Sequence, residues 1–299
     1  MNIRLLSAFT ILLLSLGATN LYSAATDAAV SDTAPAAASL PAPAAEEKPD
    51  PAVVADLNDL ITRINVKINQ DKMSETDYAD NLKEFDNLLI KHQKAPVEAR
   101  VQILLQKAIL YMEVLRLPEK ALPVFQQIKK DFPSIQISGS TDEVIAEVQE
   151  QADKKKIRDA LVDVSFPDFS EKDLGGNALS ISKYKGKVVL LDFWATWCPP
   201  CVASVPEIQK VYDKYHSKGF EVVGVSLDDE KGDLEKFVKQ RKLPWPQVFA
   251  GQRFDNKLAV KYGVAFAPTT FLIGKDGKVI KQLLNGRDDL DKEVAAALK

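Results

Sequence analysis

One segment, residues 188–201, constrains the fold of this chain more than any other: it reads Val-Val-Leu-Leu-Asp-Phe-Trp-Ala-Thr-Trp-Cys-Pro-Pro-Cys. Its apolar start, residues 188–191, is typical of a strand buried on both faces. After the second cysteine, apolar residues recur at helical spacing, namely Ala203, Val205, Ile208, Val211 and Tyr212. Cys198 and Cys201 are therefore predicted to lie where a strand passes into a helix.

This position of the two cysteines predicts redox chemistry. The unpaired N–H groups and the positive dipole end of a helix N-terminus favour a thiolate over a thiol. Residues three apart lie on one helix face, so Cys198 and Cys201 can form a disulfide. The intervening Pro199 and Pro200 are tolerated because a first helical turn does not use their missing N–H groups. The segment predicts a dithiol–disulfide switch.

A structural disulfide is the alternative, since exported proteins often contain one. A bridge that encloses only two residues restricts the unfolded chain little and therefore stabilises the fold little. The sequence contains 2 cysteines in all, which leaves no wider disulfide framework and no four-ligand cysteine site for zinc. We expect a redox-active Cys198–Cys201 disulfide, with no other cofactor and no metal.

Several further motifs occur before and after the cysteine segment. Residues 193–201 read Phe-Trp-Ala-Thr-Trp-Cys-Pro-Pro-Cys, and they are accompanied by residues 166–169 with 184–189, 220–228 and 262–269. Together these motifs resemble the TlpA/ResA-like extracytoplasmic thiol–disulfide oxidoreductases of the thioredoxin superfamily, with a redoxin-type domain. The resemblance covers Asp163 to Lys299. It is specific for the fold and much less so for the substrate.

The resemblance implies a mechanism for the cysteine pair. Cys198, the better exposed cysteine in this family, attacks a disulfide of a protein substrate as a thiolate, and Cys201 resolves the mixed disulfide. The family implies a reductase that a membrane electron donor reduces again. The residues themselves leave the direction of transfer open, because it depends on the reduction potential.

The resemblance also implies a substrate-binding surface beside the disulfide. Pro268 is expected to be cis and to face the disulfide, which leaves nearby backbone groups free to pair with an extended substrate. Trp197 adjoins the first cysteine and is expected to cover one wall of the site. The residues expected to contact substrate are Trp197, Pro199, Pro200, Ala267 and Pro268.

One carboxylate is expected to act as a proton acceptor in the reaction. Asp192 interrupts the apolar run before the cysteines, and thioredoxins carry an aspartate at the matching place. Burial there raises a carboxyl pKa, so Asp192 is expected to accept the proton of Cys201; a strand-end aspartate that reaches water is the alternative. Many family members also carry a glutamate three residues after the second cysteine, but Ser204 holds that place here, ahead of the helix-kinking Pro206.

Two segments precede the folded part of the chain. Residues 1–25 have the charged start, apolar core and small-residue end of a signal peptide, which predicts an exported, periplasmic or otherwise extracytoplasmic protein. An uncleaved signal peptide would instead tether the protein to the membrane. Residues 26–51 are rich in alanine and proline and are predicted to form a disordered linker.

Residues 52–161 are predicted to form a small all-α domain that precedes the redox domain. Residues 121–133 resemble the second helix of a single tetratricopeptide repeat, which favours a helical hairpin bundle. The last helix, residues 142–161, is charged along residues 150–158 and is expected to lead into the redox domain. Because it offers few apolar anchors, the helical and redox domains are expected to be separable units. Partner docking, dimerisation or a packed stalk all remain open for this domain. The expected apolar faces are Val54, Leu57, Leu60, Ile61, Ile64 and Ile68; Tyr78, Leu82, Phe85, Leu88 and Leu89; Val101, Leu104, Leu105, Ala108, Ile109 and Met112; and Ala121, Phe125 and Ile128.

Residues 162–299 alternate strands and helices, which predicts a thioredoxin-like three-layer α/β sandwich with a mixed sheet. A lead-in hairpin is expected, with strands at residues 164–166 and 178–180 around the turn 175–177. Later strands are expected at residues 221–227, 269–273 and 278–284, with helices at residues 232–241, 255–262 and 290–298.

Two other functions remain open. A peroxiredoxin-type thiol peroxidase would share the fold, but its Thr-x-x-Cys motif is absent because Thr196 has the wrong spacing to Cys198. The other alternative is a binding protein whose helical domain is functional and whose disulfide is vestigial. A net charge of −3, with both signs mixed, gives no reason to expect nucleic acid as a partner.

Overall fold

The computed structural model describes residues 50–70, 72–284 and 289–299, so the expected signal peptide and nearly all of the expected linker lie outside the described residues. The chain divides into two compact units, Met1–Glu150 and Gln151–Lys299. The sequence suggested a boundary later in the chain, after residue 161. The observed boundary, after Glu150, falls inside helix α6 (Thr141–Asp159). The last part of α6 therefore belongs to the second unit.

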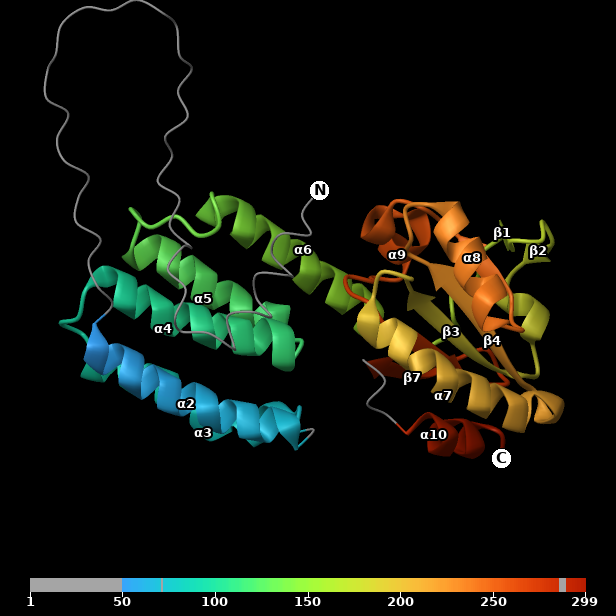
Figure 1. Cartoon of the computed structure of the whole chain (residues 1–299), viewed down its shortest axis with the longest axis horizontal. Helices are drawn as coiled ribbons and strands as arrows, with labels where there is room; N and C mark the ends of the chain where they lie inside the picture. The colour runs from blue at the N-terminus through green and yellow to red at the C-terminus, as the bar shows by residue number, and fades with distance from the viewer. Residues whose placement is uncertain (1–49, 71, 285–288) are drawn as a thin grey trace, which may run out of the picture. The chain divides into compact units, whose positions relative to one another are not determined.

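The first unit is all-helical among its described residues, as predicted. Asp50 caps helix α2 (Pro51–Asn69) by accepting a hydrogen bond from the backbone N–H of Ala52 at 2.9 Å. The apolar faces of its helices form two buried clusters, which confirms the amphipathic spacing in the sequence. One residue differs from the prediction, because Val53 is buried in the first cluster in place of Val54. The helices are α2 (Pro51–Asn69), α3 (Ala79–Lys91), α4 (Val97–Ile109), which continues as a π-helical turn (Leu110–Val114), α5 (Pro118–Asp131) and the start of α6 (Figure 1).

The second unit is built on a five-stranded mixed sheet. Its strand order is β5 (Gln247–Phe249), β4 (Phe220–Ser226), β3 (Val188–Trp194), β6 (Thr269–Ile273) and β7 (Val279–Leu284). Strands β3, β4 and β5 are parallel, whereas β6 is antiparallel to both β3 and β7. Every residue of β3 is buried, which explains its nearly continuous apolar sequence.

Helices complete the α/β sandwich of the second unit. They are α7 (Pro199–Tyr215), α8 (Lys231–Arg241), α9 (Lys257–Lys261) and α10 (Leu290–Ala297). Helices α7 and α10 pack against each other, and Figure 1 shows α7 running across the front of the sheet. The thioredoxin-like sandwich with a mixed sheet, preceded by a helical domain, is thus confirmed.

The predicted lead-in hairpin is partly wrong. The observed hairpin pairs β1 (Glu171–Lys172) with β2 (Ala178–Leu179), so its first strand is not residues 164–166. Those residues lie along the outer strand β7 instead, where the N–H of Phe166 donates to the carbonyl of Gly277 at 2.8 Å. The side chain of Phe166 is buried against Tyr262, so the apolar alternation reflects packing on the sheet edge.

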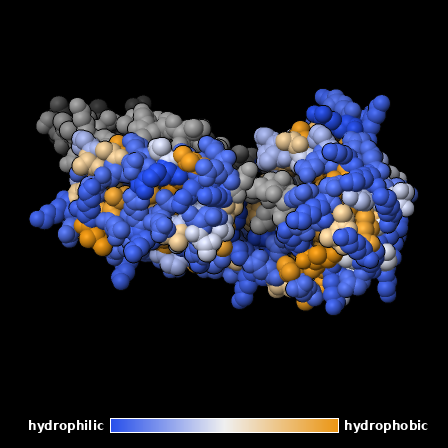
Figure 2. All heavy atoms as spheres, turned by 90° about the horizontal axis from the view of Figure 1, so that it is seen from below, coloured by the Kyte–Doolittle hydropathy of each residue, from blue (hydrophilic) through white to orange (hydrophobic). Residues whose placement is uncertain are grey.

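The surface is mostly hydrophilic in the view of Figure 2, with hydrophobic residues in small groups. Each helix within the described ranges is either too short or too polar to cross a lipid bilayer.

Candidate active site

The two cysteines form a disulfide in the first turn of α7. Cys198 is the N-cap of that helix, and the Cα atoms of Cys198 and Cys201 are 5.2 Å apart. The backbone N–H of Cys201 points at Sγ of Cys198, with a nitrogen-to-sulfur distance of 3.3 Å. Both residues are buried, with 3% of Cys198 and 1% of Cys201 exposed. Once the disulfide is reduced, the helix N-terminus favours a thiolate at Cys198.

Strand topology brings a cis proline to the same edge of the sheet as the disulfide. Strand β3 runs toward the cysteines, and β6 starts directly after Pro268. The two strands are antiparallel, and Phe193 near the end of β3 pairs with Thr269 at the start of β6. The peptide bond between Ala267 and Pro268 is cis, as expected.

Exposed residues surround the buried sulfur atoms. Trp197 is 43% exposed, and Pro199 and Pro200 are exposed too. The ring of Trp197 lies edge-on to Phe254, with 6.2 Å between centroids, and the Arg253 guanidinium lies 5.0 Å from the Trp197 ring centroid. These side chains form an exposed surface next to Cys198.

The loop that carries Arg253 has an unusual backbone. Gly251, Gln252 and Arg253 have φ values of 65°, 55° and 46°, although only the first is a glycine. A left-handed conformation is costly for the other two residues and persists only where surrounding contacts hold it. Arg253 Nε donates to the carboxylate of Asp229 at 2.5 Å, which is one such contact.

Asp192 is buried in the middle of β3. Its Cα pairs with Gly224 of β4 on one side and with Thr270 of β6 on the other. Burial raises the pKa of its carboxyl from 3.8 to about 7. Its Oδ1 has no hydrogen-bond partner among the residues that the structure describes. The expectation of a buried carboxyl with a raised pKa is confirmed, and such a group can exchange a proton near neutral pH.

Ser204 has a local role in helix α7. Its hydroxyl donates to the carbonyl of Cys201 at 2.8 Å, one turn back along the helix. Pro206 follows inside the same helix and cannot donate an N–H to the preceding turn. A serine bound to the backbone in this way supplies no ionisable group to the site.

Asp228 supports the site, although it is not among the site residues predicted from the sequence. It is buried, and its Oδ1 accepts from the N–H and the hydroxyl of Thr196 at 3.0 and 2.7 Å. Its Oδ2 accepts from the hydroxyl of Ser226 at 2.8 Å. Asp228 therefore ties the loop before the cysteines to the end of β4. One sequence signal could have identified Asp228. It follows just after a buried strand, and that strand is parallel to the one that leads to the cysteines.

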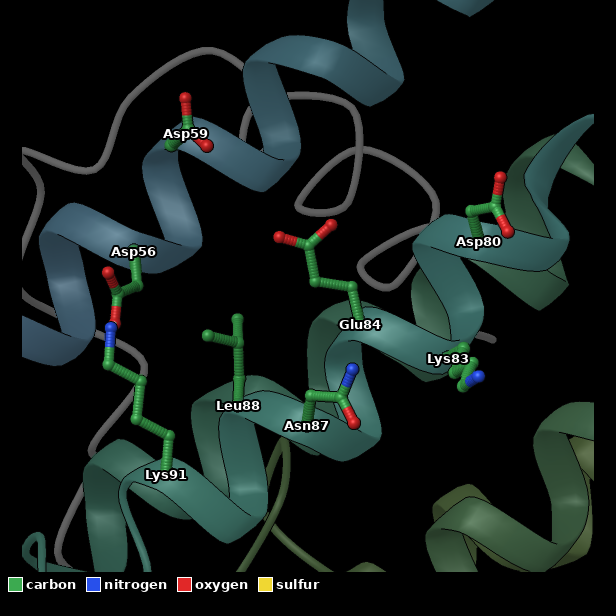
Figure 3. A pocket seen from close by; sticks show the side chains of 8 residues that line it. All are labelled: Asp56, Asp59, Asp80, Lys83, Glu84, Asn87, Leu88 and Lys91. Atoms are coloured by element: carbon green, nitrogen blue, oxygen red, sulfur yellow. The ribbon is translucent and has the colours of Figure 1, made fainter.

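A surface hollow in the first unit lies between α2 and α3 and is mostly charged (Figure 3). Its acidic groups are largely neutralised, because Asp56 binds Lys91 at 2.6 Å and Glu84 binds Arg63 at 2.6 Å. The hollow also holds no candidate metal site: across the described parts of the chain, no cluster of three or more His, Cys, Asp or Glu side chains is placed to hold a metal. The hollow is lined by Asp56, Asp59, Asp80, Lys83, Glu84, Asn87, Leu88 and Lys91.

Comparison with known proteins places the second unit in a family. Residues 161–298 match the Redoxin family model. The chain is 38% identical over 134 residues to the thiol-disulfide oxidoreductase ResA of Bacillus thuringiensis (strain Al Hakam), a match that covers 44% of this chain and 73% of the relative. ResA of Bacillus subtilis (strain 168) is 36% identical over 115 residues, covering 38% of this chain and 63% of the relative.

Among solved structures, a thiol:disulfide interchange protein from Bacteroides sp. is 33% identical, with a TM-score of 0.41, and covers 46% of this chain and 90% of its own. A disulfide across two prolines at a helix N-terminus, at the same sheet edge as a cis proline, defines a thioredoxin-fold thiol–disulfide oxidoreductase. The curated relatives show that this chain belongs to the ResA family of thiol–disulfide oxidoreductases. The TlpA/ResA-like resemblance seen in the sequence is confirmed.

Proposed function

We propose that this enzyme is an exported reductase of protein disulfides. The observation that carries the proposal is the Cys198–Cys201 disulfide at the start of α7, at the same sheet edge as the cis Ala267–Pro268 bond. In its reduced dithiol form the cysteine pair supplies the two electrons, and the backbone at the cis proline offers groups that pair with an extended polypeptide.

Reduction of a substrate disulfide proceeds in two exchange steps. The Cys198 thiolate attacks one sulfur of the substrate, the substrate S–S bond breaks, and the other substrate sulfur leaves as a thiolate. Cys201 then loses its proton and attacks Cys198 Sγ, which breaks the mixed disulfide and releases the second substrate sulfur. The substrate gains two electrons and two protons, and the Cys198–Cys201 pair is oxidised.

Asp192 accepts the proton of Cys201 in the second step. Its pKa of about 7 matches a base that works near neutral pH. Its Oδ1 atom forms no hydrogen bond to any of the described residues, so a lone pair is available for the proton. Ser204 takes no part, since its hydroxyl is bound to the carbonyl of Cys201.

The substrate lies over the exposed rim of the site. Backbone groups at Ala267 and Pro268 pair with an extended segment of the substrate, while Trp197, Pro199 and Pro200 contact its side chains. The exposure of Trp197 beside the buried Cys198 supports this arrangement.

The reductase works outside the cytoplasm and is reduced again by an electron donor in the membrane. The signal-peptide pattern of residues 1–25 supports export. The reducing direction is the one that the TlpA/ResA-like resemblance of the sequence implies. The helical unit lies outside the Redoxin match and serves a separate purpose, such as docking a partner.

Insulin reduction tests this proposal. The wild-type enzyme, with a dithiol as electron source, should reduce insulin disulfides, whereas Cys198→Ser should not. Cys201→Ser should accumulate a mixed disulfide with the substrate, because the resolving thiol is gone. The same assay with hydrogen peroxide tests the peroxidase alternative. Fast consumption of peroxide without insulin reduction would contradict the proposed function.

A further inference from the structure

Arg158, near the end of α6, is buried in the second unit with 2% of its surface exposed. Its Nη1 donates to the carbonyl of Gly263 at 2.6 Å, and its Nε donates to Oε1 of Gln282 at 3.0 Å. The amide of Gln282 donates back to the carbonyl of Arg158 at 2.6 Å. A buried guanidinium that makes several hydrogen bonds holds its partner groups in place.

These contacts act on the segment that leads to the cis proline. The guanidinium carbon of Arg158 lies 5.0 Å from the centroid of the Phe266 ring, and Phe266 immediately precedes Ala267. The segment from residue 263 to residue 268 is therefore contacted at its start and near its end by one side chain. The hydroxyl of Thr269 also donates to the carbonyl of Phe266 at 2.7 Å, which holds the same end.

The backbone of α6 approaches the same segment closely. Gly263 has a φ of 66°, and a Cβ at this position would lie 2.1 Å from the carbonyl oxygen of Lys154. Only glycine fits there, because a side chain would push the helix and the segment apart. The end of α6 is thus a packed part of the redox unit, although its charged sequence predicted few anchors there.

We propose that Arg158 is a positioning residue for polypeptide substrates: it holds residues 263–268 so that the backbone at Ala267 and Pro268 is ready to pair with substrate. This inference rests on the proposed function, in which that backbone binds an extended polypeptide. Attack by Cys198 on a small disulfide needs no such pairing. Arg158 should therefore affect the reduction of protein disulfides selectively. It lies before the Redoxin match at residues 161–298, so that match does not include it.

The test uses the full chain and two disulfides, insulin and hydroxyethyl disulfide. Arg158→Met should lower kcat/KM for insulin about tenfold or more, chiefly through KM, because a misplaced binding segment weakens productive binding. The rate with hydroxyethyl disulfide should stay within about twofold of the wild type. Arg158→Lys keeps the charge and one donor and should recover part of the loss. Lys156→Met is the matched control, because it removes an exposed cation from the same helix and should change neither rate.

Either of two results would overturn the inference. One is an unchanged rate with insulin for Arg158→Met, and the other is an equal loss with both disulfides, which indicates general damage. If Arg158→Met does not fold, as judged by circular dichroism, the same comparison for Arg158→Lys decides. A wild-type enzyme that reduces hydroxyethyl disulfide but not insulin would contradict the proposed function itself, which separates the two failures.

Discussion

The backbone N–H of Cys201 points at Sγ of Cys198 across 3.3 Å, so the first turn of α7 contacts the sulfur atom that we assign as the nucleophile. Cys198 is the N-cap residue, so its sulfur lies at the open end of the helix, whereas Cys201 lies within the first turn. The two sulfur atoms are therefore chemically unequal, although both residues are buried.

This inequality predicts different alkylation rates in the reduced protein. Cys198 should react with iodoacetamide about tenfold faster than Cys201, since the helix N-terminus favours its thiolate. Quenched labelling followed by peptide mass spectrometry measures both rates in one sample. Equal rates at the two cysteines would contradict the assignment of Cys198 as nucleophile.

A second prediction concerns proton transfer by Asp192. Asp192→Asn should slow the resolving step by about 100-fold near neutral pH, because an amide cannot accept the proton of Cys201. Stopped-flow measurement of mixed-disulfide decay isolates this step. Ser204→Ala is the control and should leave the rate nearly unchanged, since the Ser204 hydroxyl donates to the carbonyl of Cys201 and carries no ionisable group. Wild-type rates for Asp192→Asn from about pH 6 to about pH 9 would assign Asp192 a structural role and leave proton removal to water.

The same carboxyl predicts how stability depends on pH. Its pKa is about 7 in the folded protein against 3.8 ordinarily, so the folded state holds the proton more tightly than the unfolded chain does. Stability should therefore fall as pH rises from about 4 to about 7 and lose no more above that range. Asp192→Asn should be more stable than the wild type by about 2–4 kcal/mol at about pH 8, with little difference at about pH 4. Urea unfolding at both pH values measures this, and a gain of equal size at both would exclude ionisation as the cause.

The contact between Asp228 and Thr196 supports a fourth prediction. Asp228→Ala should destabilise the protein by about 2–4 kcal/mol, because it leaves two half-buried donors of Thr196 and the buried hydroxyl of Ser226 without their acceptor. Thr196→Val removes a single hydroxyl and should cost about 1 kcal/mol. Both variants should also slow insulin reduction, since the loop before Cys198 loses its anchor. Chemical unfolding and insulin assays together test this; a fully stable Asp228→Ala variant would contradict it.

The core strands and the site motif could be predicted from the sequence because their signals are local. Strand β6 has the predicted bounds, Thr269–Ile273, since a proline precedes it and an apolar run fills it. The cysteine pair and the cis proline lie within motifs of a few residues. The lead-in hairpin was mispredicted because Glu171 and Lys172 carry no apolar alternation, and their pairing depends on the turn that follows.

The remaining features depend on contacts far along the chain. Arg158 lies in a charged stretch that is typical of a solvated helix, but its partners Gly263 and Gln282 are 105 and 124 residues away. Asp228 is 32 residues from Thr196. Such partners are set by the tertiary fold, and local periodicity carries no signal for them.

The reduction potential of the Cys198–Cys201 couple tests the central claim, that this enzyme reduces protein disulfides, most directly. Equilibration with dithiothreitol or glutathione redox buffers, followed by thiol trapping, gives its value. For a reductase we expect a potential close to that of thioredoxin, about −270 mV, because such a couple donates electrons to most accessible disulfides. A potential near that of the oxidant DsbA, about −120 mV, would contradict the account and assign the enzyme to disulfide formation.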